Sequence, residues 1–393
     1  MHAPPPSVFL VSDQYTRYDY GAAHPMRIGR LPLTVEVAAA CGLLGGPGVR
    51  VLPASPASDE DLCRFHHPEY LAALKRASAG EAGWDLLRWG LGSGDNPAFP
   101  GVYEFSALLT GATLSAGRLV EAGEARVAFN IAGGLHHAAP NRASGFCYVN
   151  DAAVLIAELA ARGRRVAYVD IDAHHGDGVQ FGFYETDQVL TISLHETGEI
   201  LFPGTGFPEE TGKGPGEGFS VNVPLAPGTD DEIFLWALEA VVLPLLKAYA
   251  PDLLVTQLGI DTHRTDPLAH LDLSIQGFRR AVEILRGCDL PWVALGGGGY
   301  DIANVPRAWT AAWAVMTGRE LPDLLPEAAQ RALQERGIRR TTLSDPLPPP
   351  EPRGRAEAWR YARASVARVQ ELIFPRFGLT AGGAAPARGV RMG

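Results

Sequence analysis

The sequence has 393 residues, of which 46% are hydrophobic and 20% are charged, and its net charge is −10. These values are typical of a globular protein long enough to bury a large core, and α/β chains of this size often form one domain. The acidic balance argues against direct binding to nucleic acid, and it would attract a cationic substrate such as a lysine-rich segment.

The chain carries no pattern that predicts export or membrane insertion. Its first residues lack a basic region followed by an apolar one, and no apolar stretch reaches transmembrane length. The four cysteines form no C-x-x-C pair, which argues against a zinc knuckle and a disulfide framework. We therefore expect a soluble protein of the reducing cytoplasm, and the sequence leaves the oligomeric state open.

Short apolar runs alternate with helical patterns along the chain. The apolar runs predict strands at Val8–Val11, Val49–Leu52, Arg126–Ile131, Val166–Ile171, Val189–Leu194, Ser220–Leu225, Leu253–Leu258 and Trp292–Leu295. The helical patterns lie at Pro32–Leu44, Pro68–Ser78, Val102–Ala122, Asp151–Arg162, Asp230–Ala250 and Ser274–Arg286. Strands that alternate with helices favour an α/β fold: a single domain with a mostly parallel sheet flanked by helices.

The last part of the chain has a different composition. A proline-rich connector, Leu347–Pro352, leads to a predicted final helix at Ala356–Phe374. The residues after it are rich in glycine and alanine, which is typical of disorder. We predict one domain over residues 1–378 and a disordered tail over 379–393.

A strand followed by charged side chains dominates the middle of the sequence. Asp170, Asp172, His174 and Asp177 come at or just after the end of the predicted strand Val166–Ile171. Ligands of open α/β sheets bind outside the carboxyl ends of strands, and strand alternation puts the first three side chains on one side. Burying unpaired charge is costly, so we expect these groups to bind a cation, and the mixture of carboxylate and imidazole suits zinc or another transition metal. The alternative is a solvated acidic loop.

Three other loops follow predicted strands. Gly133–His137 ends in two adjacent histidines, His136 and His137, which could be general acid and base, metal ligands or polar loop residues. Asp261 follows the strand Leu253–Leu258 and could be a third ligand, although alone it reads more readily as an N-cap or turn residue. Gly296–Gly299 delivers Tyr300 at the end of a strand; a mononucleotide-binding turn is the competing interpretation, but the G-x-G-x-x-G spacing is missing.

Five motifs, in this order and spacing, resemble those of the class I histone deacetylases. They are Ala132–His137, Gly145–Asp151, Asp170–Gly178, Phe202–Gly206 and Gly296–Tyr300, and the resemblance runs over about residues 24–318. The stretch Asp261–Leu271 is similar to the bacterial acetoin-utilisation deacetylases. The resemblance implies the arginase/deacetylase fold, with one eight-stranded mostly parallel sheet flanked by helices. It also implies a metal-dependent hydrolase that cuts linear amide C–N bonds.

The same resemblance implies the catalytic roles. Asp172, His174 and Asp261 would hold one Zn²⁺, with Fe²⁺ as the alternative, and water would take an open position. His136 and His137 would be the paired acid/base imidazoles, backed by Asp170 and Asp177 respectively. Tyr300 would polarise the acyl carbonyl. Zinc-activated water, an oxyanion donor and a proton source for the leaving amine together meet the needs of amide hydrolysis.

Further residues are implied around this centre. The resemblance assigns substrate binding to Asp95, Gly145, Phe146, Phe202 and Leu268, with the two phenylalanines forming the walls of a narrow tube for a lysyl chain. It places Arg30 near an inner acetate cavity. It also implies a structural K⁺ near Asp170, Asp172, His174 and Ser193.

Two departures from the arginase branch favour a single metal. His263 stands where those relatives carry a second metal-binding aspartate, and Gly176 stands where another would be needed. We therefore expect one catalytic metal, with His263 at the rim or in a loop. The leading interpretation is a zinc-dependent deacetylase of Nε-acetyl-lysine in proteins or peptides, linked to acetoin or acetate metabolism. The alternatives are an acetylpolyamine or other small-amide hydrolase and a non-catalytic acyl-lysine binding module.

Overall fold

Eight strands form one sheet within the residues that the computed structural model describes, which are 5–92, 94–346 and 354–380. The strands are β1 (Ser7–Val11), β2 (Val49–Pro53), β3 (Val127–Asn130), β4 (Val166–Asp170), β5 (Val189–Glu196), β6 (Ser220–Leu225), β7 (Leu253–Gln257) and β8 (Trp292–Leu295). Their order is β2-β1-β3-β8-β7-β4-β5-β6, and every neighbouring pair is parallel. The predicted fold is confirmed, and each predicted strand lies within two residues of its observed bounds.

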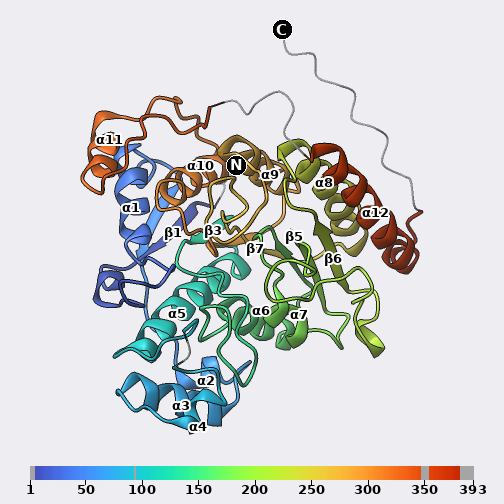
Figure 1. Ribbon diagram of the computed structural model, residues 1–393, viewed down its shortest axis with the longest axis horizontal. Coiled ribbons are helices and arrows are strands. Elements are labelled where there is room, and N and C mark those ends of the chain that lie inside the picture. Colours follow the sequence, from blue (N-terminus) through green and yellow to red (C-terminus); the bar gives the residue numbers. More distant parts are fainter. Residues whose placement is uncertain (1–4, 93, 347–353, 381–393) are drawn as a thin grey trace.

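Helices cover both faces of this sheet (Figure 1). Those of the described residues are α1 (Arg30–Ala40), α2 (Asp59–Leu62), α3 (Pro68–Ser78), α4 (Trp84–Leu87), α5 (Val102–Glu121), α6 (Asp151–Ala161), α7 (Asp177–Gly182), α8 (Asp231–Tyr249), α9 (Ile275–Gly287), α10 (Val305–Thr317), α11 (Glu327–Gln334) and α12 (Arg355–Ile373). Helices α1, α10, α9 and α8 lie on one side of the sheet, and α5 and α6 lie on the other.

The predicted helices are all present, and only the first differs from its observed bounds by more than one residue. The first predicted helix, Pro32–Leu44, is α1 and runs instead from Arg30 to Ala40. It begins earlier because Pro32 fits in the first turn, where a backbone N–H has no helical partner to lose. It ends earlier because Gly42, just beyond it, adopts φ +72°.

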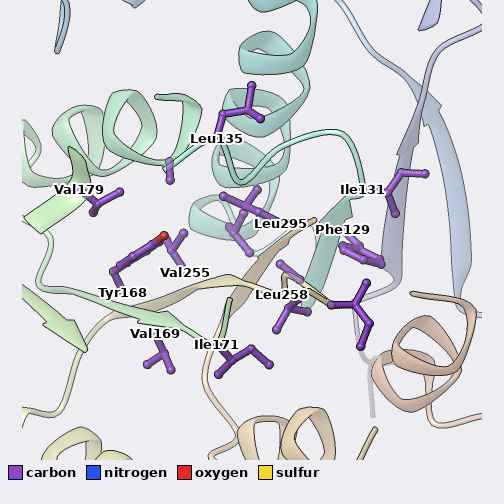
Figure 2. Close-up of a cluster of buried hydrophobic side chains, with 14 of the residues drawn as sticks. Phe129, Ile131, Leu135, Tyr168, Val169, Ile171, Val179, Val255, Leu258 and Leu295 are labelled. Atoms are coloured by element: carbon purple, nitrogen blue, oxygen red, sulfur yellow. The ribbon is translucent and has the colours of Figure 1, made fainter. Parts of the chain in front are cut away.

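The core of the sheet is apolar on both faces. All residues of β3, β4 and β7 are buried, as expected for strands covered by helices on two sides. Figure 2 shows part of this core: Tyr168 and Val169 of β4 point to opposite sides of the strand, and Phe129 of β3, Val255 of β7 and Leu295 of β8 are buried near it. These side chains give the loops at the strand ends a rigid base.

Four adjacent strands, β3, β8, β7 and β4, carry the segments singled out from the sequence. Because the strands are parallel, their carboxyl ends meet at one edge of the sheet, where open α/β folds bind ligands. The loops that follow them, residues 131–150, 296–304, 258–274 and 171–176, therefore converge above this edge.

The C-terminal region is described in part. Helix α12 matches the predicted last helix and packs against α8 and β6 (Figure 1). The predicted connector Leu347–Pro352, and residues 381–393 of the predicted tail, lie outside the described residues, so the domain division stays a prediction. Among the described helices, none combines the length and apolarity needed to cross a membrane.

Candidate active site

Asp172, His174 and Asp261 bring their ligand atoms together at the carboxyl ends of β4 and β7. His174 Nδ1 lies 3.1 Å from Asp172 Oδ1 and 3.0 Å from Asp261 Oδ2, and all three side chains are buried. The register of the strands explains why these three side chains lie close together: Asp170 of β4 pairs with Gln257 of β7, and each ligand follows its strand within four residues. The alternative of a solvated acidic loop is therefore wrong.

The donor set fits a metal ion better than it fits a hydrogen-bonded cluster. One imidazole nitrogen carries at most one proton, so it cannot donate fully to two carboxylates at once. Ligand atoms at typical zinc distances in a tetrahedron are roughly 3.3 Å apart, close to the observed spacings. Burial and the neighbouring charge of Asp172 raise the pKa of Asp261 to about 8, which means that they destabilise its ionised form. A bound cation would stabilise the ionised carboxylate.

The glycine loop after β8 closes over these ligands. Gly298 N–H donates to Asp172 Oδ2 at 2.8 Å. A Cβ atom at position 298 would lie 1.9 Å from Asp261 Oδ2, so only glycine allows the backbone to approach the carboxylates this closely. Gln257 Nε2 also donates to Asp172 Oδ2, at 2.5 Å. These contacts orient the carboxylates in the way typical of metal sites.

The paired histidines lie beside this centre, and each is hydrogen-bonded to a different carboxylate. His136 Nδ1 donates to Asp170 Oδ2 at 2.8 Å, and His137 Nδ1 donates to Asp177 Oδ1 at 2.7 Å. The two Nε2 atoms are 3.0 Å apart. The contacts with the carboxylates fix the orientation of both rings.

The two imidazoles have opposite pKa shifts. Burial alone would lower the pKa of His136, but the charges of Asp170 and Asp172 outweigh it and raise that pKa to about 9. Burial and the neighbouring His136 lower the pKa of His137 to about 4. At neutral pH His137 is thus neutral, with its Nε2 as a hydrogen-bond acceptor.

Tyr300 follows a backbone turn that is held from two sides. Arg30 is buried, and its guanidinium donates to the carbonyl oxygens of Gly297 and Gly299, both at 2.7 Å. The backbone N–H of Tyr300 donates to Asp266 Oδ2, also at 2.7 Å. Burial and the charge of Asp261 hold the pKa of Tyr300 well above its ordinary value, so the phenol keeps its proton and can donate it in a hydrogen bond.

A cavity of about 210 Å³ connects these groups to the surface. Its lining residues are Asp95, His137, Gly145, Phe146, His174, Leu201, Phe202, Leu268 and Tyr300. The structure thus brings together all five predicted substrate-binding residues, one predicted ligand, one of the two histidines and Tyr300. Asp95 is exposed, Phe202 is 44% exposed, and His137 and His174 are buried.

Gly145 and Phe146 form a two-residue β-turn between Ser144 and Cys147, whose backbones exchange hydrogen bonds of 3.0 and 2.8 Å. Both central residues have positive φ, +52° and +69°, as in type I′ turns. This conformation is rare for a bulky residue such as Phe146. Tyr20 helps to hold it, because its hydroxyl donates to the Phe146 carbonyl at 2.9 Å.

Ser193 lies on β5 directly opposite Asp170 of β4, as the predicted K⁺ site requires. Its hydroxyl is 2.8 Å from His195 Nδ1. Asp170 already accepts hydrogen bonds from His136, from the Tyr168 hydroxyl at 2.7 Å and from the Asp172 backbone at 3.1 Å. The K⁺ site stays a prediction.

His263 lies in the loop after β7, one of its two expected places, and the alternative place at the rim is wrong because the side chain is buried. The residue is 2% exposed, and its Nε2 donates to Asp345 Oδ2 at 2.7 Å. Asn304 Nδ2 donates to its Nδ1 at 2.8 Å. Asp345 also pairs with buried Arg307 at 2.9 Å, so His263 ties the loop after β7 to the C-terminal part of the domain.

Several residues of the site were not predicted. Leu201 lines the cavity, Tyr168 and Gln257 hold Asp170 and Asp172, and Asp266 accepts the Tyr300 amide. Asp151 accepts the backbone N–H groups of Gly134 and Leu135, which precede the histidine pair. Of these, only Asp151 had a local signal, since it follows the helix N-cap Asn150 within a recognised motif.

Comparisons with known proteins agree with this geometry. Residues 24–316 match the histone deacetylase domain. The chain belongs to the histone deacetylase family. It is 41% identical over 320 residues to the acetoin utilization protein AcuC of Bacillus subtilis, covering 79% of this chain and 82% of that protein. It is also 41% identical over 323 residues to histone deacetylase 19 of Arabidopsis thaliana, covering 81% of this chain and 64% of that protein.

A solved structure, that of an HDAC homolog from Aquifex aeolicus, has a TM-score of 0.84 to this fold and 36% identity, covering 92% of this chain and all of that chain. The predicted family and the arginase/deacetylase fold are thereby confirmed. The protein is a deacetylase, a hydrolase of amide bonds from a metal-dependent family, and it presents a buried Asp-His-Asp site.

Proposed function

We propose that this deacetylase uses zinc to hydrolyse the amide of Nε-acetyl-lysine in proteins or peptides, releasing lysine and acetate. One observation carries the proposal: the buried ligand set Asp172, His174 and Asp261 opens, through His174, into a narrow cavity that also presents His137 and Tyr300. Relatives that are named histone deacetylases support a protein substrate. The name of the Bacillus subtilis relative supports a link to acetoin metabolism.

The chain's own side chains account for most of the reaction. When bound, zinc would act as a Lewis acid on the acyl carbonyl and lower the pKa of water. His137, neutral and facing the cavity, takes the proton from the attacking water and returns it to the leaving amine. Tyr300 donates its hydroxyl hydrogen to the carbonyl oxygen as negative charge develops there. His136 and the carboxylates Asp170 and Asp177 keep the imidazoles aligned.

The shape of the cavity supports a linear aliphatic substrate. Phe146 and Phe202 line it, and the Phe146 ring meets that of Tyr300 edge to face, with centroids 5.6 Å apart. Leu268 adds an apolar wall, while the exposed Asp95 can accept backbone N–H groups of a peptide. We propose further that Arg30 borders the space that receives the acetate, and that K⁺ binds near Asp170 and Ser193.

The test is a comparison of substrates with the purified, zinc-loaded protein. We expect kcat/KM for acetyl-lysine peptides to exceed that for N-acetylated polyamines, and elemental analysis to give one zinc per chain. Reconstitution with Fe²⁺ in the same assay identifies the more active metal. A preference for acetylpolyamines would replace the protein substrate by a small amide, and binding of the peptides without turnover would indicate an acyl-lysine binding module.

A further inference from the structure

One carboxylate, that of Asp266, holds two walls of the cavity at once. Its Oδ2 accepts the backbone N–H of Tyr300 at 2.7 Å, and its Oδ1 accepts the backbone N–H of Leu268 at 2.9 Å. Tyr300 follows β8, whereas Leu268 lies in the loop after β7. The side chain thus joins two loops that approach each other only in the folded protein.

Asp266 is itself fixed. It is 7% exposed, and its backbone N–H donates to the His263 carbonyl at 2.8 Å. The His263 ring is held by Asn304 and Asp345. The carboxylate therefore extends from a buried, hydrogen-bonded backbone, and turning it away would break its bonds to the Tyr300 and Leu268 amides.

The segment before Tyr300 needs such a contact. Four glycines, Gly296–Gly299, offer no side chains to pack, and Gly297 and Gly299 adopt φ of +123° and +136°. Glycine is the residue with the greatest conformational freedom to lose, so hydrogen bonds must fix this backbone. Arg30 holds the carbonyl groups of the loop, and Asp266 holds the amide of Tyr300 itself.

We propose that Asp266 is a positioning residue that aims the Tyr300 phenol into the cavity and couples it to the Leu268 wall. This inference rests on the proposed function, in which Tyr300 stabilises the developing oxyanion. Asp266 acts through Tyr300, so removing its charge lowers kcat only while the phenol is present.

The test is a double-mutant cycle with Asp266→Asn and Tyr300→Phe. Asparagine keeps the shape of the aspartate side chain, but its NH₂ group faces one of the two backbone N–H donors, so one hydrogen bond is lost. We expect Asp266→Asn to lower kcat on an acetyl-lysine peptide by about 10–100-fold, the range for losing a hydrogen bond to a charged group. KM and the metal content should change little. In the Tyr300→Phe background the same substitution should change kcat by less than about threefold, since coupled residues are not additive.

Asp272→Asn is the matched control, because Asp272 lies in the same loop and its carboxylate pairs with Arg264 at 3.5 Å. It should leave kcat near that of the wild type. Equal losses from Asp266→Asn in both backgrounds, or a loss equal to that of the control, would overturn the proposal.

A second measurement is independent of turnover. Hydrogen exchange, followed by mass spectrometry, should be faster at the Tyr300 amide in Asp266→Asn than in the wild type and the Asp272→Asn control. Unchanged exchange would refute the positioning role. If the wild type hydrolyses no acetyl-lysine peptide, or if Tyr300→Phe retains full kcat, the proposed function fails, and amide exchange still decides whether Asp266 holds Tyr300.

Discussion

Gly145→Ala is the substitution for which the structure gives the most specific expectation. Gly145 has φ +52°, and an added Cβ would lie 2.4 Å from His137 Cδ2 and 2.9 Å from Phe202 Cε1. Ordinary carbon contacts are about 3.5–4.0 Å, so the two rings must move apart by roughly 1 Å. One ring belongs to the proposed general base, and the other is a wall of the cavity.

Two costs follow from this geometry. The left-handed backbone conformation costs an alanine about 1–2 kcal/mol, which lowers the free energy of unfolding. Displacing a catalytic group by about 1 Å can cost about 10²-fold in rate, so we expect kcat/KM for an acetyl-lysine peptide to fall by about 100-fold. The metal content should not change, because the atoms nearest to the added methyl group belong to His137 and Phe202 and not to Asp172, His174 or Asp261.

Gly163→Ala separates the two costs. Gly163 has φ +76°, but an added Cβ would have no heavy atom within 4 Å. The control should lose the same stability of about 1–2 kcal/mol in urea unfolding and keep a wild-type kcat/KM. If Gly145→Ala is as active as Gly163→Ala, then the contact with His137 and Phe202 does not govern catalysis, and the reasoning is refuted.

Other substitutions test single features of the site. Tyr300→Phe should lower the single-turnover rate of the zinc-loaded protein by about 10²–10³-fold without loss of metal, and a rate within about threefold of wild type would remove the hydroxyl from the mechanism. Phe146→Ala should raise KM for acetyl-lysine peptides, because one apolar wall worth about 1.5–3 kcal/mol is lost; an unchanged KM would place the lysyl chain elsewhere. Asp172→Ala should abolish both metal binding and activity in elemental analysis and peptide assays, and two metals per active wild-type chain would contradict a single site. His263→Leu should lower the free energy of unfolding by about 1–3 kcal/mol, because Asp345 loses a buried donor, and unchanged urea unfolding would argue against this role.

The sheet could be predicted from the sequence because its signal is local. Strands buried on both faces read as short apolar runs. All eight strands were recognised, including β2, which has no buried residue. Helix α10 was missed for a related reason. All its residues except Thr317 are buried, so it lacks the polar face that gives a surface helix its period of 3.6 residues.

The parts of the site that escaped prediction depend on contacts between distant segments. Asp345 lies 82 residues from His263, and no local pattern connects them. Asp266 reads as a turn residue before proline, and its bond to Tyr300 spans 34 residues. The turn at Gly145 and Phe146 was unforeseen because a bulky residue with positive φ contradicts local preference, and the surrounding fold must impose it.

Two of the metal ligands could be predicted from local spacing, whereas the third depends on the order of the strands in the sheet. Asp172 and His174 could be paired from their spacing alone, because two residues apart at a strand end place them on one side. Asp261 lies 87 residues beyond His174, and by itself it resembled a turn residue. It joins them because β7 pairs in parallel with β4, which sets Gln257 opposite Asp170 and brings both chains past the sheet edge together. Asp261 is therefore a candidate ligand only once the order of the strands is known. Either a proton or a metal ion could offset the charge of the two buried carboxylates. Because one nitrogen of His174 lies within 3.1 Å of both and carries at most one proton, a metal ion fits the site better.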